Sequence, residues 1–207
     1  MAIEWFRNEN WSRTIESHFF EKLRRARDKS QYLRIQARYL AESYPEVALM
    51  LLEKYFSLGD HFDKAQAFVD EATAYASLGR LEEATQSLLK ALEREREFPN
   101  SRTQAWSQFA LLVVGKKLQS QYERALQVLE ERKSQLTFPV DRFLWHATYA
   151  LIKEAQGSLQ TAREHAKEAL GAAQMGHSGF RYHPKVGLVG SKYGEIQDRL
   201  LRLTAKT

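Results

Sequence analysis

Cysteine is absent from the 207-residue chain, and this absence excludes several kinds of chemistry at once. Disulfides, thiolate zinc sites, iron–sulfur clusters and cysteine nucleophiles all need the sulfur that the chain lacks. Proline and glycine are scarce as well, at 4 and 10 residues. Because both residues interrupt helices, their scarcity favours long helices.

Long hydrophobic runs are missing too. A membrane-spanning helix needs roughly 18 apolar residues, whereas the longest run here, 109–114, has six. The first seven residues lack the basic segment followed by an apolar stretch that marks a secretory signal. We therefore expect no membrane span and a cytoplasmic location.

The amino-acid composition is typical of a globular protein. Hydrophobic residues make up 43%, aromatic residues 12% and charged residues 28%, proportions that fit neither disorder nor a fibrous class. The net charge of +5 is unevenly spread: residues 1–44 carry +3, residues 45–135 carry −2 and residues 136–207 carry +4. Both ends are basic and the middle is not.

Apolar residues recur with the period of a helix along almost the whole chain. A first helix is predicted over 11–29, where Ile15, Phe19, Leu23 and Ala26 share one face. Pairs of helices then follow at 30–43 with 46–58, 61–78 with 81–97, 101–118 with 121–135, and 140–156 with 159–174. A terminal helix is predicted from the apolar stripe formed by Ile196, Leu200, Leu201 and Leu203.

Helix-breaking residues lie between these segments. Pro45, Pro99 and Pro139 precede predicted helices, and Gly59, Gly79 and Gly157 stand where helices should end. A recurrence every 35–40 residues is the signature of a helical-repeat array.

The segment 68–91 resembles the tetratricopeptide repeat (TPR). The consensus asks in order for a large, a small, an aromatic, a glycine, a large, a small, a large and a small residue, and the matching residues are Phe68, Ala72, Tyr75, Gly79, Leu81, Ala84, Leu88 and Ala91. Weaker matches extend the resemblance over about 30–174. The spacing from Ala84 to Ala125 is 41 residues and that from Ala125 to Ala162 is 37, so another helical-repeat superfamily with longer helices remains an alternative.

The resemblance implies an all-α fold, a right-handed α-solenoid of antiparallel helix pairs. Residues 1–174 would form the N-terminal helix and about four TPR-like pairs. Residues 175–207 would form a Gly-rich loop and a capping helix, packed on the same domain.

Tetratricopeptide-like proteins mostly hold peptides or helices of other proteins on the concave face of the array. Carried over to this chain, that geometry assigns the concave face to eight apolar or small residues: Leu33, Ala37, Val69, Thr73, Ala110, Val114, Ala147 and Leu151. The Lys, Asn and Arg set with which some members grip a terminal carboxylate is missing. The alternatives are that these residues are simply core, that the C-terminal helix fills the groove, or that a second copy does.

The segment 171–194 departs most from the repeat, since it holds six of the ten glycines. Backbone amides freed by glycine could hold a phosphate or carboxylate there, with His177, Arg181, Tyr182, His183, Lys185 and Lys192 around it. The alternative is an ordered connector that folds back over the last repeat.

The spacing of residues in this segment does not match three known kinds of chemical site. Residues 187–192 have the composition of a phosphate loop but not its order, and residues 176–179 lack one position of a nucleophile elbow. His177 and His183 have no acidic residue between them, whereas a metal needs three or four donors. We expect no metal, no cofactor and no enzymatic activity.

A basic patch near the N-terminus supports a rival function. Seven cations fall within 17 residues: Lys22, Arg24, Arg25, Arg27, Lys29, Arg34 and Arg38. They could engage phosphates, although Glu21 and Asp28 also permit a solvated face with local ion pairs.

The sequence therefore predicts a non-catalytic adaptor that binds a partner helix or peptide of another protein, with a homodimer as one form of that partner. The alternative is binding of nucleic acid or an anionic surface through the basic N-terminal helix and the C-terminal loop.

Overall fold

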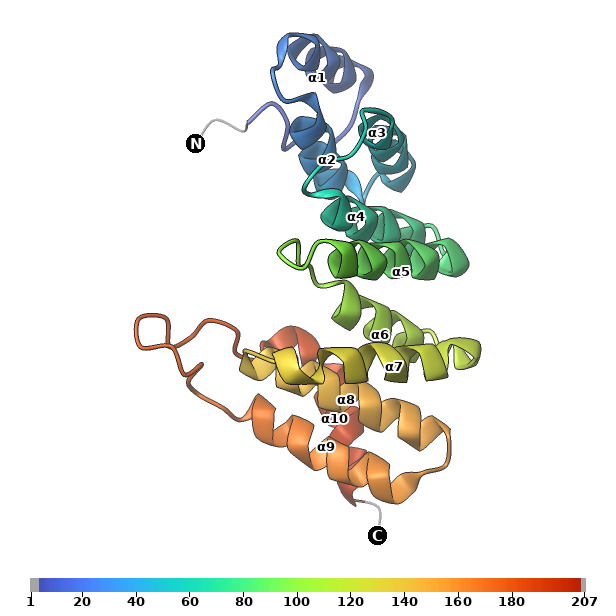
Figure 1. Cartoon of the computed structure of the whole chain (residues 1–207), viewed down its shortest axis with the longest axis vertical. Coiled ribbons are helices and arrows are strands. Elements are labelled where there is room, and N and C mark those ends of the chain that lie inside the picture. The colour runs from blue at the N-terminus through green and yellow to red at the C-terminus, as the bar shows by residue number, and fades with distance from the viewer. Residues whose placement is uncertain (1–3, 206–207) are drawn as a thin grey trace. The chain divides into compact units, whose positions relative to one another are not determined.

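The computed structural model describes residues 4–205, and within that range every regular element is helical (Figure 1). Ten α-helices follow one another: α1 (Arg13–Arg25), α2 (Lys29–Leu40), α3 (Pro45–Ser57), α4 (Lys64–Ser77), α5 (Leu81–Glu97), α6 (Ala105–Gly115), α7 (Tyr122–Arg132), α8 (Pro139–Ala155), α9 (Leu159–Ala173) and α10 (Gly194–Ala205). Three short 3-10 turns lie at 119–121, 133–135 and 191–193.

The prediction of an all-α fold is confirmed, and the helix bounds lie close to those read from periodicity. Pro45 and Pro139 each open a helix at its first position, where a missing amide leaves no bond unmade. Gly79 follows α4 with a φ of +73°, and the amide of Arg80 donates to Tyr75 O at 2.9 Å. Glycine is needed there because other residues adopt this left-handed conformation at a cost.

The chain forms two compact units, residues 1–105 and residues 106–207. The predicted boundary at 174 lies at the end of α9, inside the second unit.

In the first unit, α1, α2 and α3 enclose a core around Phe19, Leu51 and Tyr55, all fully buried. The segment before α1 packs on this core, with the Trp5 ring 5.5 Å from Phe19 and 4.8 Å from Tyr32. Two of the four tryptophans, Trp5 and Trp11, therefore anchor the N-terminal segment and not a helix pair.

Hydrogen bonds fix the same segment. The buried side chain of Gln36 accepts from the backbone amide of Asn8 at 3.0 Å and from its side chain at 2.7 Å, and donates to Asn8 O at 2.8 Å. A fully buried amide is stable only when its polar atoms are satisfied, and this arrangement satisfies both ends of Gln36.

Helices α4 and α5 form the closest pair of the first unit. The residues that match the TPR pattern are buried here, with Ala72 at 2% exposure, Ala84 and Ala91 at 0% and Leu88 at 2%. Small side chains at these positions let the two helix backbones approach. The sequence interpretation of these alanines as packing residues is consistent with this burial.

In the second unit α8 packs against α9, and α10 lies against both. Leu200 and Leu203 of α10 are buried, Arg199 Nη2 lies 2.9 Å from Glu154 Oε2 of α8, and the Tyr193 ring is 5.5 Å from Phe143. The terminal helix α10 therefore packs on the last helix pair of this unit.

The turn between α6 and α7 uses no glycine. Lys117 adopts a φ of +54° there, and the amide of Leu118 donates to Val113 O at 2.9 Å. The bond closes the end of α6 as a glycine turn would. Among the described residues no helix is both long enough and apolar enough to cross a membrane.

Candidate functional site

The eight residues assigned to a concave face are mostly buried within their own units. Seven of them are at most 8% exposed, from Ala37 and Ala110 at 0% to Val114 at 8%. The eighth, Thr73, is partly buried and its hydroxyl donates to Val69 O at 3.1 Å. This burial corrects the expectation of a partner surface at these positions, because apolar helix faces bury themselves against neighbouring helices first.

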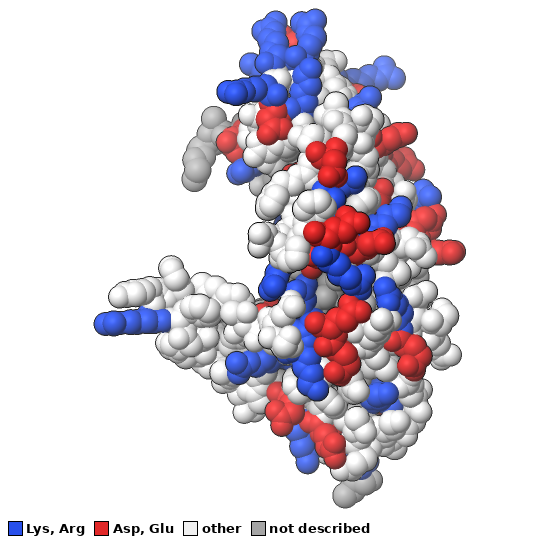
Figure 2. Space-filling view, in the orientation of Figure 1, with Lys and Arg blue, Asp and Glu red and all other residues white. Residues whose placement is uncertain are grey.

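The basic patch divides into two groups. Lys22, Arg24, Arg25, Arg27 and Lys29 are exposed around the end of α1, and Figure 2 shows the Lys and Arg side chains gathered there. Arg25 also pairs with Glu21 at 3.3 Å. Such exposed pairs contribute little to stability and leave the cations open to solvent.

Arg34 and Arg38 belong to an internal ion network instead. Arg34 lies between two carboxylates, with Nε bonded to Asp63 and Nη1 3.2 Å from Asp70 Oδ2. Arg38 Nη1 lies 3.5 Å from the same Asp70, and Tyr55 Oη donates to Asp63 at 2.7 Å. These residues join α2, α3 and α4, so the two arginines serve the fold of the first unit.

Burial governs the protonation of this network. It raises the pKa of the Asp70 carboxyl, against the hydrogen bond from Gln66 and the charges of the two arginines. Burial by itself lowers the pKa of Arg34, but the hydrogen bond to Asp63 and the neighbouring carboxylates raise it overall. Burial and the bond to Asp63 also raise the pKa of Tyr55.

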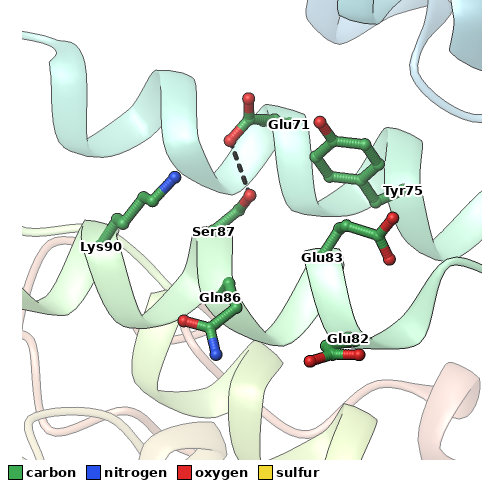
Figure 3. A pocket seen from close by; sticks show the side chains of 7 residues that line it. All are labelled: Glu71, Tyr75, Glu82, Glu83, Gln86, Ser87 and Lys90. Carbon is green, nitrogen blue, oxygen red and sulfur yellow. Dashed lines mark hydrogen bonds between the residues drawn. The ribbon is translucent and has the colours of Figure 1, made fainter.

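A shallow acidic groove lies on α4 and α5 of the first unit. Figure 3 shows Glu71 and Ser87 pointing toward each other across it, with the Tyr75 ring beside Glu83, and the Ser87 hydroxyl donates to Glu71 at 2.6 Å. Glu82, Gln86 and Lys90 complete the lining.

The groove is already internally paired. Arg80 lies 2.7 Å from Glu83 and 4.7 Å from the Tyr75 ring centre, and the Ser87 hydroxyl holds Glu71. Carboxylates beside an aromatic face suit a cationic side chain, and here Arg80 occupies that role. The Ser87–Glu71 and Arg80–Glu83 contacts pair two of the acidic side chains of the lining, so the groove has the character of a polar surface feature.

The predicted anion-binding segment forms an ordered loop in the second unit, called here the basic loop, residues 174–190. Ser178 is its organising residue: its amide donates to Pro184 O at 2.8 Å, and its hydroxyl donates to His183 O at 2.7 Å while accepting from the amide of Phe180 at 3.2 Å. The His177 ring accepts from the amide of Gly179 at 2.9 Å. His177 thus holds the turn.

The basic loop is attached to the start of α8. The amide of Val140 donates to Gly187 O at 2.8 Å, and the Phe180 ring lies 5.3 Å from Phe138. Beyond these contacts the loop projects from the helices of its unit, and Figure 2 shows Lys or Arg at the projecting tip. Arg181, Tyr182, His183 and Lys185 are all exposed. The sixth predicted residue, Lys192, is exposed on the 3-10 turn before α10.

Sequence reasoning missed a pair of histidines in the second unit. His146 Nδ1 of α8 lies 3.0 Å from His165 Nδ1 of α9, and the His165 ring stacks 4.3 Å from Tyr149. Burial lowers the pKa of His146 to about 4, with a further contribution from His165, and burial also lowers the pKa of His165. Lys133, Glu130, Glu164 and Glu168 are the surrounding charges.

The histidine pair makes the stability of the second unit dependent on pH. Because both folded pKa values lie below 6.5, the unfolded chain takes up protons first as the pH falls. We expect the free energy of unfolding to drop by about 1–2 kcal/mol between pH 6.5 and about 4, a range that allows for partial exposure of both rings.

The measurement is urea unfolding at several pH values. A His146→Gln variant should flatten the profile over that interval. Substitution of the exposed His18 is the control and should leave the pH dependence of the free energy of unfolding unchanged. The same pH dependence in both variants would show that the histidine pair is not its cause.

In residues 4–205 no group of three or more His, Asp or Glu side chains is arranged to hold a metal.

The most exposed apolar side chains of the first unit also escaped sequence reasoning. Phe62 is 74% exposed, Leu58 46% and Phe98 45%, and we call these three the loop-end patch. Ser101 joins their two loops, since its hydroxyl donates to Phe62 O at 2.6 Å and its amide donates to Phe98 O at 2.8 Å. The available signal was an aromatic residue in each turn, Phe62 three residues after Gly59 and Phe98 directly before Pro99.

Comparison of the chain with family models, with curated proteins and with solved structures found no match.

Proposed function

We propose that the protein is a non-catalytic adaptor that binds another protein, and that the loop-end patch of the first unit is its contact surface. The observation that carries this proposal is the exposure of Phe62, 74%. A single exposed apolar residue is ordinary, but three large ones on adjoining turns form the kind of surface that marks an interface.

The patch has the construction of an interface centre. Arg94 lies 3.6 Å from the Phe98 ring centre, 2.6 Å from Asp60 and 3.2 Å from Glu97, so ion pairs lie next to Phe98 and link its turn to the turn that contains Asp60. Aromatic residues, phenylalanine included, and arginine are enriched in protein interfaces relative to the rest of the surface. A partner segment bearing apolar side chains would fit this surface.

The proposal retains the tetratricopeptide-like stacking of helix pairs and a cytoplasmic location as expectations. Burial of Ala72, Ala84 and Ala91 supports close pairing of the α4 and α5 helices. Because the residues first assigned to the partner surface are mostly buried, we place the partner surface on the turns between helices.

The test is site-specific photocrosslinking in the source cells, with the photoreactive residue at position 98. We expect a discrete adduct with one protein, reduced about tenfold or more by the further change Phe62→Asp. Because Phe62 is 74% exposed, this change should alter the free energy of unfolding by less than about 0.5 kcal/mol.

Glu53 on α3 provides the control position, since it is exposed and lies outside the patch. A photoreactive residue there should give no such adduct. Identical adducts from positions 53 and 98, or an adduct that Phe62→Asp leaves unchanged, would remove the loop-end patch as the contact surface.

A further inference from the structure

The basic loop of the second unit and the residues on either side of it have an unusual charge distribution. From residue 169 to residue 194 the sequence contains no Asp or Glu, while Arg181, Lys185 and Lys192 supply positive charge. All three cations are exposed. The segment therefore offers cations that no acidic residue of the same segment neutralises, which indicates an anionic ligand.

An aromatic side chain lies beside one of these cations. Tyr182 is 80% exposed, the highest value among the large apolar and aromatic side chains, and the Arg181 guanidinium lies 5.5 Å from its ring centre. Phe180, 43% exposed, leans on Phe138 and so supports the loop from behind. An exposed ring with a cation beside it suits an unpaired base and its neighbouring phosphate.

Hydrogen bonds within the loop and to α8 also support its conformation. The hydrogen bonds of Ser178 close its two arms, and the bond between Val140 and Gly187 attaches it to α8. A preformed loop loses less conformational entropy on binding than a flexible one.

From these three observations we infer that the basic loop binds single-stranded nucleic acid. Tyr182 stacks on an unpaired base, and Arg181 and Lys185 contact the phosphates on either side. This function goes beyond the proposed adaptor role and involves the other compact unit, so each can fail without the other.

Other anionic partners fit the loop less well. A duplex keeps its bases stacked and offers Tyr182 no free face. Recognition of an anionic membrane typically uses four to eight clustered cations, more than the three in this segment. An acidic peptide would satisfy Arg181 and Lys185 but would leave the tyrosine face without a partner.

The experiment is fluorescence anisotropy with the full chain and labelled 12-nucleotide strands of U or dT. We expect saturable binding in the micromolar range, weakening with salt by about 0.7 in log K per log unit for each phosphate contact. Tyr182→Ala should weaken binding about tenfold with an unchanged salt slope. Arg181→Ala with Lys185→Ala should reduce the slope by about 1.4.

Two controls separate this site from general basicity. Tyr182→Phe should retain the affinity, because the ring is kept. Lys116→Ala with Lys167→Ala removes two exposed cations outside the loop and should change affinity less than about twofold.

Several results would overturn the inference. They are the absence of saturable binding, equal affinity for a 12-base-pair duplex, for an acidic peptide or for phosphatidylserine vesicles, and an affinity insensitive to Tyr182→Ala. Loss of binding only when Arg24, Arg25 and Arg27 become alanine would assign it to α1 instead.

Discussion

Replacing Arg34 with alanine should destabilise the first unit by about 3 kcal/mol. The side chain is only 16% exposed and is the main partner of Asp70, which is 2% exposed. Without the guanidinium, the buried Asp70 carboxylate keeps only the longer contact with Arg38 and the hydrogen bond from Gln66. A buried charge left short of partners is among the most destabilising changes a protein can undergo.

Urea unfolding of the variant measures this effect, and Arg38→Ala is the matched control. Arg38 contacts the same carboxylate but is 62% exposed, so its removal should cost less than about 1 kcal/mol. The double variant Arg34→Ala, Asp70→Ala should recover part of the loss, because no unpaired charge then remains at position 70. Equal effects of the two single arginine variants would contradict the network as described.

Replacing Gly187 with alanine should destabilise the second unit by about 2–4 kcal/mol and detach the basic loop from α8. Gly187 has a φ of +69°, and an added Cβ would lie 2.5 Å from both Cβ and Cδ1 of Phe138. Backbone strain and steric overlap act together at this position. Since Phe138 Cβ is itself involved, rotation of the ring does not remove the clash.

Hydrogen exchange at the Val140 amide reports on the attachment directly, because that amide donates to Gly187 O. Exchange should accelerate in the variant, alongside a lower unfolding midpoint. Gly179→Ala is the matched control: its φ is +90° but no atom lies within 4 Å of the added Cβ, so only the backbone term of about 1 kcal/mol applies. Similar losses at both glycines would show that contact with Phe138 is unimportant.

Periodicity and breakers predicted the helices well, because local spacing of apolar residues decides where a helix can bury one face. Pro139 and Gly79 are examples in which one residue type fixes an end through its backbone geometry. The end of α6 was harder to locate, since Lys117 adopts a conformation that glycine normally supplies.

The candidate site was less accessible to sequence reasoning. Spacing identifies that Val69 and Ala110 are apolar but not whether another helix already covers them. Arg34 lies 29 residues from Asp63 and 36 from Asp70, so pairing across helices is invisible to rules that compare residues three or four apart. The basic loop, in contrast, was identified from its content of glycine and cationic residues. That pattern pointed to the exposed residues of the loop but not to Ser178, whose hydrogen bonds close it.

The close approach of His146 and His165 restricts where their hydrogens can be. A 3.0 Å separation between the two Nδ1 atoms accommodates one hydrogen, so one ring carries it on Nδ1 and the other on Nε2. The rings therefore hold opposite tautomers, and neither can exchange its form unless the other does so at the same time. Helices α8 and α9 are thereby joined by one N–H···N hydrogen bond, in which the Nδ1 atom of one histidine donates and the Nδ1 atom of the other accepts.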